Sequence, residues 1–340
     1  MGILNVAAAH GATIQYTYLM NILVTGGAGF IGSHLSERLI VDGHTVTVLD
    51  NLSTGQIPNL ESIKGNSRFT FVNGSILDVN ILTPLIAKTD YIFHLAAAVG
   101  VFNIVKNPLS SLLTNIRGTE NILEGAYSRN VPVFLTSSSE VYGKNISNSL
   151  RETDDRILGS PLTLRWSYSE AKAIDESLAY AYYIEKQLET RIVRFFNTVG
   201  PRQLGAYGMV VPRFVKSAIS NEPITIYGDG RQTRCFAHVY DVVDAVIALA
   251  FAKNTVGKVI NIGNDFEISI NDLAQKIITE TGSKSEIKYL SYDEAYGDGF
   301  EDMERRVPNL ELINQLVGWK PKRDLSTMIR DISLEMKKNS

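Results

Sequence analysis

The feature of this sequence that most constrains its fold is a set of three glycines between an apolar segment and a segment with helical spacing. Residues 21–25 (NILVT) predict a short β-strand, and the turn after it contains Gly26, Gly29 and Gly32. Glycine permits a tight turn here, and the N-terminus of the following helix stabilises a pyrophosphate. A second predicted strand, 45–49, ends at Asp50, 18 residues after Gly32. A carboxylate there accepts hydrogen bonds from an adenosine ribose and repels a 2′-phosphate, so the pattern predicts NAD in preference to NADP.

Apolar segments alternate with helical segments along the rest of the chain. Further strands are predicted at 69–72, 91–95, 131–135, 191–195 and 257–262, and helices at 168–187, 211–220, 239–252, 269–282, 310–317 and 326–337. This alternation predicts an α/β fold: a Rossmann-type doubly wound parallel sheet with helices on both faces. Because no low-complexity linker divides the chain, we expect a smaller α/β substrate-binding lobe that is interleaved with the first domain.

The predicted domain boundaries follow from this pattern. Residues 1–19 read as an N-terminal extension without Lys or Arg, which argues against a secretory signal. The NAD-binding domain is predicted at 20–195, with 235–262 returning to it, and the substrate-binding lobe at 196–234 and 263–340. No apolar run approaches the roughly 18 residues that a membrane helix needs, so we expect no membrane partner.

Charge and cysteine content exclude several classes of function. The net charge is −3 and Lys and Arg are dispersed, so we expect no nucleic-acid partner. Cys235 is the only cysteine, which rules out an intramolecular disulfide, argues against a thiolate metal cluster and fits a reducing cytoplasm. We expect no metal site.

A candidate catalytic pair lies on one predicted helix. Tyr168 and Lys172 are four residues apart and therefore share a helix face, where the ammonium can favour the ionised form of the phenol. A phenol is a poor base at neutral pH unless its pKa is lowered from about 10. The spacing alone recurs by chance, but behind an NAD-binding segment it indicates proton and hydride chemistry.

From residue 20 onward the chain resembles the extended short-chain dehydrogenase/reductase superfamily. The matching segments are 25–32, 50–53, Asp78, 94–97, Asn115, 137–143, Tyr168 with Lys172, and 195–202. The resemblance implies that Asp78 approaches the adenine and that Lys172 binds the nicotinamide ribose, while His94 is expected to be a packed strand residue. The implied cofactor-binding residues are Gly26, Gly29, Phe30, Ile31, Gly32, Asp50, Asn51, Ser53, Asp78, Ala96, Ala97, Asn115, Tyr168 and Lys172.

Within that superfamily the chain is similar to enzymes that act on nucleotide-diphosphate sugars. The resemblance implies that Asn197 meets the phosphates, that Val211 and Tyr227 flank the base, and that Arg234 meets ribose or phosphate. A guanidinium suits the last task because its planar donors match phosphate oxygens. His238 and Cys235 are expected to be core residues.

The resemblance also implies a reaction. Tyr168, assisted by Ser138, takes the proton of the sugar C4 hydroxyl while hydride leaves for NAD, and a 4-keto sugar results. Return of hydride to the other face gives a 4-epimerase, and loss of a hydroxyl gives a dehydratase. A C5 carboxylate makes the intermediate a β-keto acid, which can lose carbon dioxide.

Glu140 favours decarboxylation among these outcomes. The Ser-Glu-Val-Tyr-Gly segment at 139–143 resembles the UDP-glucuronate decarboxylases, and a carboxylate that can be protonated can help to manage the proton needed at C5. Dehydratases usually have Asp before this Glu, whereas this chain has Ser139, so dehydration is disfavoured.

A second signal lies in residues 296–308. It resembles a Tyr-Gly-x-Gly-aromatic segment leading to Arg-x-Pro in the UDP-4-amino-arabinose-pathway decarboxylase and in UDP-apiose/xylose synthase, which implies that Arg306 faces the substrate. Arg165-Trp166-Ser167 resembles the same branch, whereas Val199 departs from the Tyr of UDP-xylose synthases. The implied catalytic residues are Tyr168, Lys172, Ser138, Ser139, Glu140 and Arg306.

These signals leave three functions to compare. A UDP-glucuronate decarboxylase is the first, and a 4-epimerase of UDP-glucose, UDP-glucuronate or UDP-N-acetylglucosamine is the alternative. A non-catalytic NAD-binding regulator is a remote third, because a sensor has no reason to keep the Ser138, Tyr168 and Lys172 set. The family resemblance also implies a homodimer through a four-helix interface made by helices near 104–129 and 168–187.

Overall fold

The computed structural model describes residues 19–100, 104, 106–205, 209–291, 294–295, 303 and 305–338. Its main element is a seven-stranded sheet in the order β11-β6-β5-β4-β1-β2-β3, with every neighbouring pair parallel. The strands are β1 (Asn21–Thr25), β2 (Thr45–Asp50), β3 (Phe69–Asn73), β4 (Tyr91–His94), β5 (Val133–Ser138), β6 (Thr190–Phe195) and β11 (Val259–Ile262). The predicted Rossmann-type sheet is confirmed. The predicted extension, residues 1–19, lies outside the described residues except for Leu19.

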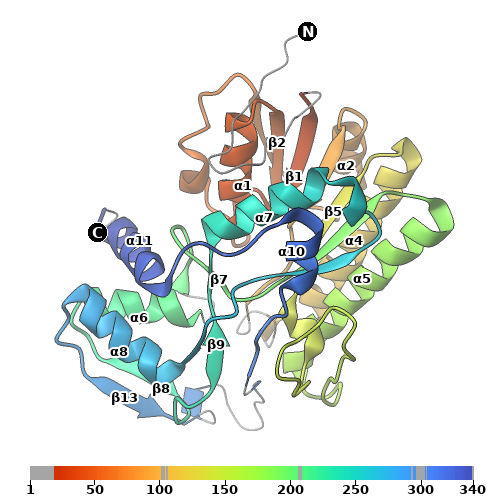
Figure 1. Cartoon of the computed structure of the whole chain (residues 1–340). Helices are drawn as coiled ribbons and strands as arrows, with labels where there is room; N and C mark the ends of the chain where they lie inside the picture. The colour runs from red at the N-terminus through yellow and green to blue at the C-terminus, as the bar shows by residue number, and fades with distance from the viewer. Residues whose placement is uncertain are drawn as a thin grey trace.

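Helices cover both faces of this sheet (Figure 1). One face packs against α1 (Phe30–Val41), α7 (Val239–Phe251) and α10 (Glu311–Val317), and the other against α2 (Val79–Ile86), α4 (Pro108–Arg129) and α5 (Ser167–Lys186). Successive strand residues point to opposite faces, so Ile22 and Val24 lie in one core and Leu23 in the other. Both faces are buried, which explains why the strands read as continuous apolar runs.

A smaller group of elements packs beside the sheet and has its own core. It contains α6 (Val210–Ile219), α8 (Ile270–Thr281) and α11 (Leu325–Lys338), with the parallel pair β8 (Ile224–Tyr227) and β13 (Ile287–Leu290) and the antiparallel pair β9 (Thr233–Cys235) and β12 (Glu267–Ser269). Two further strands, β7 (Thr198–Val199) and β10 (Ala237–His238), form a short parallel pair. Each lies where the chain passes from one group to the other: β7 follows β6 of the large sheet, and β10 precedes α7. These strands of two to four residues were not predicted, because so few residues carry no measurable periodicity.

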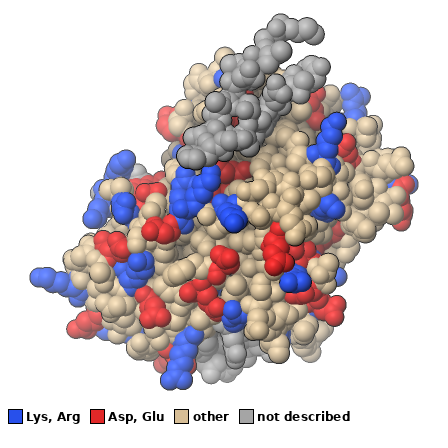
Figure 2. All heavy atoms as spheres, in the orientation of Figure 1, with Lys and Arg blue, Asp and Glu red and all other residues tan. Residues whose placement is uncertain are grey.

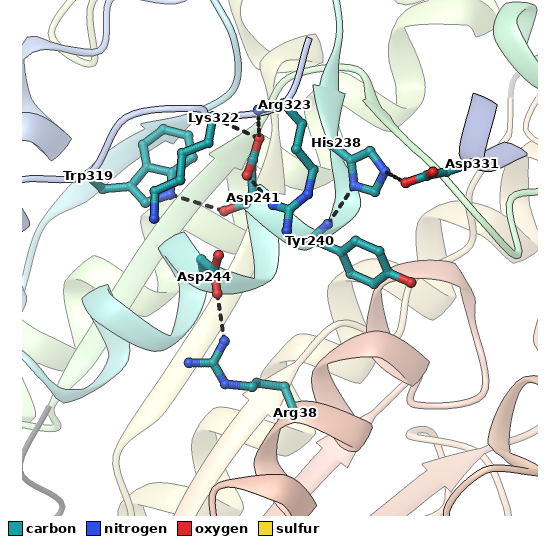
Figure 3. Close-up of polar contacts among 9 residues, drawn as sticks. All are labelled: Arg38, His238, Tyr240, Asp241, Asp244, Trp319, Lys322, Arg323 and Asp331. Carbon is teal, nitrogen blue, oxygen red and sulfur yellow. Dashed lines mark hydrogen bonds and ion pairs between the residues drawn. The ribbon is translucent and has the colours of Figure 1, made fainter. Parts of the chain in front are cut away.

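The predicted lobe boundary is wrong for α10. We placed 263–340 in the smaller lobe, yet Ile313 and Trp319 are buried in the core that α1 and α7 form against the large sheet. Asp241, at the start of α7, anchors the segment that follows α10 (Figure 3). Its carboxylate accepts from the backbone N–H of Lys322 at 3.0 Å and of Arg323 at 2.9 Å, and it pairs with the Arg323 guanidinium. The Trp319 indole N–H donates to the Asp241 carbonyl at 3.1 Å.

The surface carries charges of both signs. On the face drawn in Figure 2, basic and acidic side chains are interspersed. Among the described residues, no helix is both long enough and apolar enough to cross a bilayer.

Candidate active site

A cavity of about 710 Å³ lies where the carboxyl ends of the sheet strands meet the smaller lobe. Its lining includes residues at or just after the ends of β1, β2, β4 and β5, together with Val211 of α6 and Tyr227 of β8. Parallel α/β sheets bind ligands at this edge, and the volume falls in the range of roughly 300–1,000 Å³ typical of small-molecule sites.

The glycine turn between β1 and α1 forms one end of the cavity. Gly26 has a φ of +71°, and a Cβ on it would lie 2.7 Å from the Ala96 nitrogen. A Cβ on Gly32 would lie 2.2 Å from the Gly26 carbonyl oxygen. A side chain on Gly26 would collide with the backbone just after β4, and one on Gly32 would collide with the turn itself. The backbone can therefore follow this path only with glycine at both positions. The N-cap residue of α1 is Gly29, which lines the cavity and leaves the helix N-terminus open to a phosphate.

Asp50 presents a carboxylate beside this turn. Its Oδ2 accepts from the Ala28 N–H at 3.0 Å and its Oδ1 from the Leu52 N–H at 2.8 Å, and the residue lines the cavity. Burial raises its pKa, and the backbone donors oppose that shift. The glycine cradle, the helix N-terminus and the carboxylate at the end of β2 together fit an NAD-type dinucleotide.

Most of the predicted cofactor residues line the cavity, and two do not. Asp78 caps α2 by accepting from the Asn80 N–H at 3.0 Å and is absent from the described lining. Asn115 lies behind the lining, where its side chain accepts from the Ala98 N–H at 2.7 Å and donates to the Ala98 carbonyl at 3.3 Å. The twelve that line it are Gly26, Gly29, Phe30, Ile31, Gly32, Asp50, Asn51, Ser53, Ala96, Ala97, Tyr168 and Lys172.

The candidate catalytic groups converge from β5 and α5. Strand β5 runs on to Ser138, beyond the predicted end at 135, and the 3-10 turn Ser139–Tyr142 begins with Ser138 as its N-cap. The Ser138 side chain hydrogen-bonds the Tyr168 phenol, which lies in the first turn of α5. Lys172 lies one turn further along and is buried. The hydroxyl, phenol and ammonium therefore share one wall of the cavity.

One electrostatic expectation for this wall is wrong. We predicted that Lys172 favours the ionised phenol, but the Lys172 ammonium is paired with Asp175 at 3.1 Å and also donates to the Thr136 carbonyl at 3.1 Å. The pKa of Tyr168 is raised, first by burial and then by the charges of Glu140 and Asp175, while the Ser138 hydrogen bond opposes the shift. Without a bound cofactor, Tyr168 is a neutral phenol.

Glu140 lies between two arginines in the lining of the cavity. Arg165 Nη1 is 2.5 Å from Glu140 Oε2, and Arg306 Nη1 is 2.7 Å from Glu140 Oε1. Arg306 Nη1 also lies 3.2 Å from the Ser139 hydroxyl. The Arg306 segment is anchored by a bridge to Leu150, whose N–H donates to the Val307 carbonyl at 2.8 Å. Residues 296–302 of the motif that predicted Arg306 lie outside the described residues.

This geometry corrects the expected protonation of Glu140. Burial alone would raise its pKa, but the charges of Arg165 and Arg306 and their hydrogen bonds lower it to about 2. Glu140 is therefore a carboxylate at neutral pH and is no ready proton donor. Sequence reasoning treated Arg165 only as part of a motif, and its contact with Glu140 is the feature that it missed.

The predicted nucleotide-binding residues form the other end of the cavity. Asn197, Val211, Tyr227 and Arg234 all line it. The Asn197 amide donates to the Cys235 carbonyl at 2.9 Å, which fixes its orientation. Arg213, which was not predicted, places its guanidinium carbon 3.9 Å from the centroid of the Tyr227 ring and also lines the cavity.

The lining as a whole is cationic. Its described residues include six cations and only two acids, Asp50 and Glu140. The cations are Arg165, Lys172, Arg202, Arg213, Arg234 and Arg306. Such a lining suits a ligand that carries several negative charges.

The residues expected to be structural are buried outside this lining. The two ring nitrogens of His94 hydrogen-bond the Thr25 hydroxyl at 2.7 Å and the Thr119 hydroxyl at 3.2 Å. Burial, and after it the charge of Lys172, lowers the pKa of His94 to about 3. Cys235 is a buried free thiol whose pKa is raised to about 12, chiefly by burial. His238 is fully buried and faces Asp331 at 3.2 Å (Figure 3). Among the described residues, no cluster of His, Cys, Asp and Glu could hold a metal ion.

Comparison with known proteins identifies the family. A family model described as GDP-mannose 4,6 dehydratase matches residues 23–332. A UDP-N-acetyl-alpha-D-glucosaminuronate decarboxylase of Bacillus cytotoxicus is 40% identical over 300 residues, which cover 88% of this chain and 92% of that protein. UDP-glucuronic acid decarboxylase 1 of Xenopus tropicalis is 38% identical over 302 residues, covering 88% of this chain and 68% of that one.

A solved structure agrees with this placement. The UDP-glucuronic acid 4-epimerase of Bacillus cereus, in complex with UDP-glucuronic acid and NAD, superposes with a TM-score of 0.84 at 29% identity, covering 94% of this chain and all of that one. The dinucleotide site and the candidate catalytic wall described above therefore occur in a chain that belongs to the GDP-mannose 4,6 dehydratase family of NAD-dependent short-chain dehydrogenases/reductases.

Proposed function

We propose that this chain is an NAD-dependent UDP-hexuronate decarboxylase that works through a 4-keto intermediate. The observation that carries the proposal is the pair of arginines on Glu140, at 2.5 and 2.7 Å. One carboxylate faces two guanidinium groups, so the cluster keeps a net positive charge beside Tyr168. That charge suits a sugar with a C5 carboxylate. The named relatives support UDP-glucuronate and UDP-N-acetylglucosaminuronate as the candidate substrates.

The residues of this wall divide the work in the proposed reaction. When bound, NAD supplies a reversible acceptor for the hydride at the sugar C4. Tyr168, once ionised with cofactor and substrate in the cavity, would take the proton of the C4 hydroxyl as a phenolate, and Ser138 would hydrogen-bond the same oxygen. Lys172 is proposed to hold the nicotinamide ribose. Arg306 pairs with the substrate carboxylate, with Ser139 beside it, and Glu140 stays ionised against Arg165.

Loss of carbon dioxide then follows from the chemistry of the sugar. With a ketone at C4 and a carboxylate on C5, the breaking carbon–carbon bond places its electrons in an enolate that extends to O4. The protonated Tyr168 phenol can hydrogen-bond that oxygen. A proton from water would then add at C5 in place of the lost carbon dioxide. Return of the hydride to C4 and of the Tyr168 proton to its oxygen would restore the hydroxyl.

The substrate nucleotide is proposed to lie across the smaller lobe. Asn197 and Arg234 would contact the diphosphate and ribose, and Val211 and Tyr227 would flank the base. Arg213 supports the Tyr227 ring from its stacked position at 3.9 Å. The proposed division of the chain is an NAD-binding domain at 20–195 with 235–262, and a UDP-sugar-binding lobe at 196–234 and 263–340 without the α10 region.

A UDP-sugar 4-epimerase is the second candidate. It shares every step up to the 4-keto sugar, and the Bacillus cereus 4-epimerase superposes over nearly the whole chain. The two functions separate at the fate of the C5 carboxylate.

Product analysis tests the proposal. The purified protein is incubated with UDP-glucuronate, UDP-N-acetylglucosaminuronate, UDP-glucose and UDP-N-acetylglucosamine, and the products are resolved by mass spectrometry and NMR. We expect a UDP-pentose or its acetamido counterpart, lighter than the substrate by one carbon dioxide. A product of unchanged mass with inverted C4 would reject decarboxylation and establish the epimerase.

We also propose a homodimer, formed by α4 and α5 through a four-helix interface, that works in the cytoplasm. The two helices lie side by side at one edge of the molecule (Figure 1) and carry exposed apolar side chains. These are Leu109 and Tyr127 on α4, and Ile174, Tyr180 and Ile184 on α5. The use of a single cysteine in the chain fits a reducing compartment.

A further inference from the structure

The partner of the catalytic lysine is a buried carboxylate that the proposed reaction does not use. Lys172 Nζ donates to Asp175 Oδ2 at 3.1 Å, and the two side chains are 3% and 0% exposed. A second donation, to the Thr136 carbonyl on β5, is also 3.1 Å long. The ammonium is thus held from the protein side by two acceptors, on α5 and β5.

Asp175 is itself held in a polar layer under the cavity. Thr119 of α4 hydrogen-bonds its carboxyl group, and the Thr119 hydroxyl lies 3.2 Å from His94 Nε2. His94 Nδ1 reaches the Thr25 hydroxyl, at the end of β1, at 2.7 Å. Burial lowers the pKa of His94 to about 3, so the imidazole is neutral and carries no charge that could replace Lys172 as the partner. The layer therefore joins the lysine to the strand that leads into the glycine turn.

We propose that Asp175 is a positioning residue for Lys172: it anchors the ammonium on the protein side and withholds part of its charge from the Tyr168 phenol. The inference rests on the proposed role of Tyr168 as the base. A buried carboxylate one helical turn from the lysine neutralises its field, because charges interact strongly where water is excluded. The base is thereby kept as a phenol until cofactor and substrate occupy the cavity.

Other charged and titratable groups also lie near Tyr168, Lys172 and Asp175. Glu140, in the 3-10 turn, opposes ionisation of Tyr168, and its own charge is balanced by Arg165 and Arg306. Glu176, next to Asp175, is paired with Arg194 of β6 at 2.7 Å and contributes no free charge. From β4 and α4 the facing groups are the neutral His94 and Thr119. Asp175 is therefore the one carboxylate among these described groups whose partner is the catalytic lysine.

Substitution of Asp175 by Asn tests the proposal, because Asn keeps an acceptor for Lys172 and removes the charge. In the NAD-loaded enzyme, the rising limb of kcat/KM against pH reports ionisation of the base. We expect Asp175→Asn to shift this limb to lower pH by about one unit or more, since one opposing charge is gone. Asp175→Glu, which keeps the charge, should leave the limb near its original position. Glu185→Gln removes an exposed charge from the same helix and should not move it.

A second readout needs no turnover and separates this inference from the proposed function. In cofactor-free protein labelled with carbon-13 at tyrosine Cζ, the Tyr168 signal is the one lost in Tyr168→Phe. It should begin to titrate at lower pH in Asp175→Asn than in the original chain. An unshifted signal, or activity lowered equally at every pH, would overturn the proposal even if the substrate is confirmed. If Asp175→Asn does not fold, Asp175→Ser makes the same charge change and carries the same expectation.

Discussion

Arg306 Nη1 lies 2.7 Å from Glu140 Oε1, and this contact joins the C-terminal part of the chain to the turn after β5. Arg165 approaches the other oxygen of the same carboxylate at 2.5 Å. If Arg306 pairs with a substrate carboxylate, as proposed, Glu140 keeps Arg165 as a partner and is not left as an unpaired buried charge.

Acid should weaken the fold through Glu140. Its folded-state pKa of about 2 lies below the ordinary value of about 4.3, so its contribution to stability is present above that ordinary value and is lost as the pH falls toward 2. The contribution is on the order of 3 kcal/mol. Urea unfolding should show the chain more stable than Glu140→Gln near neutral pH, with the difference shrinking on acidification. Glu311→Gln, in an exposed pair with Arg151, should show no such trend, and a constant difference for Glu140→Gln would contradict the assignment.

Removing the phenolic oxygen of Tyr168 should stop chemistry and spare cofactor binding. Tyr168→Phe is expected to lower kcat by a factor of about 10² to 10⁴, the usual contribution of a positioned acid–base group. Affinity for NAD, measured by calorimetry, should fall far less than kcat, because Tyr168 is only one of the predicted cofactor-binding residues and the glycine turn and Asp50 are untouched. Tyr180→Phe, an exposed tyrosine on the same helix, should keep full activity. Unimpaired turnover by Tyr168→Phe would remove the residue from its role as base.

The sequence predicted the parts of the molecule that local patterns specify. Strand runs such as 21–25 and the glycine turn are dictated by short-range sterics and burial, and they were placed correctly. The contact between Arg165 and Glu140 depends on how the segment before α5 folds back onto the turn after β5, which no periodicity reveals. The same holds for α10, because its place against α7 and β11 depends on tertiary packing that its own apolar pattern does not specify.

The pairing of Lys172 with Asp175 was accessible from the sequence and was overlooked. Residues three apart on a helix are neighbours, so an Asp in that position competes with Tyr168 for the ammonium. The prediction used only the four-residue spacing of Tyr168 and Lys172 and left out the charge of Asp175. Asp78 also has a structural role that its motif position does not reveal, because its side chain caps α2. Its predicted contact with the adenine stays a prediction.

Arg306 should discriminate between carboxylated and neutral sugars. Losing a buried charged contact costs about 2–5 kcal/mol, so Arg306→Gln is expected to lower kcat/KM for the UDP-hexuronate by a factor of at least about 30. Inhibition by UDP-glucose, which has no carboxylate, should change little. The matched control is Arg305→Gln, since Arg305 points instead to Glu267 with two contacts of 2.7 Å. Equal losses for the two kinds of ligand would argue that Arg306 only grips the phosphates.

Asp241 should be worth far more to stability than its neighbour Asp244 (Figure 3). Asp241 is 1% exposed and accepts from two backbone N–H groups and the Arg323 guanidinium, so Asp241→Asn leaves a poorly matched buried site. We expect a loss of about 3–5 kcal/mol in the free energy of unfolding. Asp244 pairs with Arg38 at 2.6 Å, but its side chain is 37% exposed, and Asp244→Asn should cost about 1 kcal/mol or less. Similar losses of unfolding free energy for the two variants would show that the packing of the segment after α10 does not depend on Asp241.

The proposed dimer should depend on the exposed apolar face of α5. Ile174 and Ile184 are 43% and 57% exposed in the single chain, and covering such side chains against a second copy removes apolar area from water. Sedimentation at micromolar concentration should show a dimer, and the double change Ile174→Asp with Ile184→Asp should give a monomer, because burying two new carboxylates is costly. Leu334→Asp, on an equally exposed position of α11, should leave the dimer intact. A chain that sediments as a monomer before any substitution would refute the interface, and a dimer that survives both α5 changes would place it elsewhere on the surface.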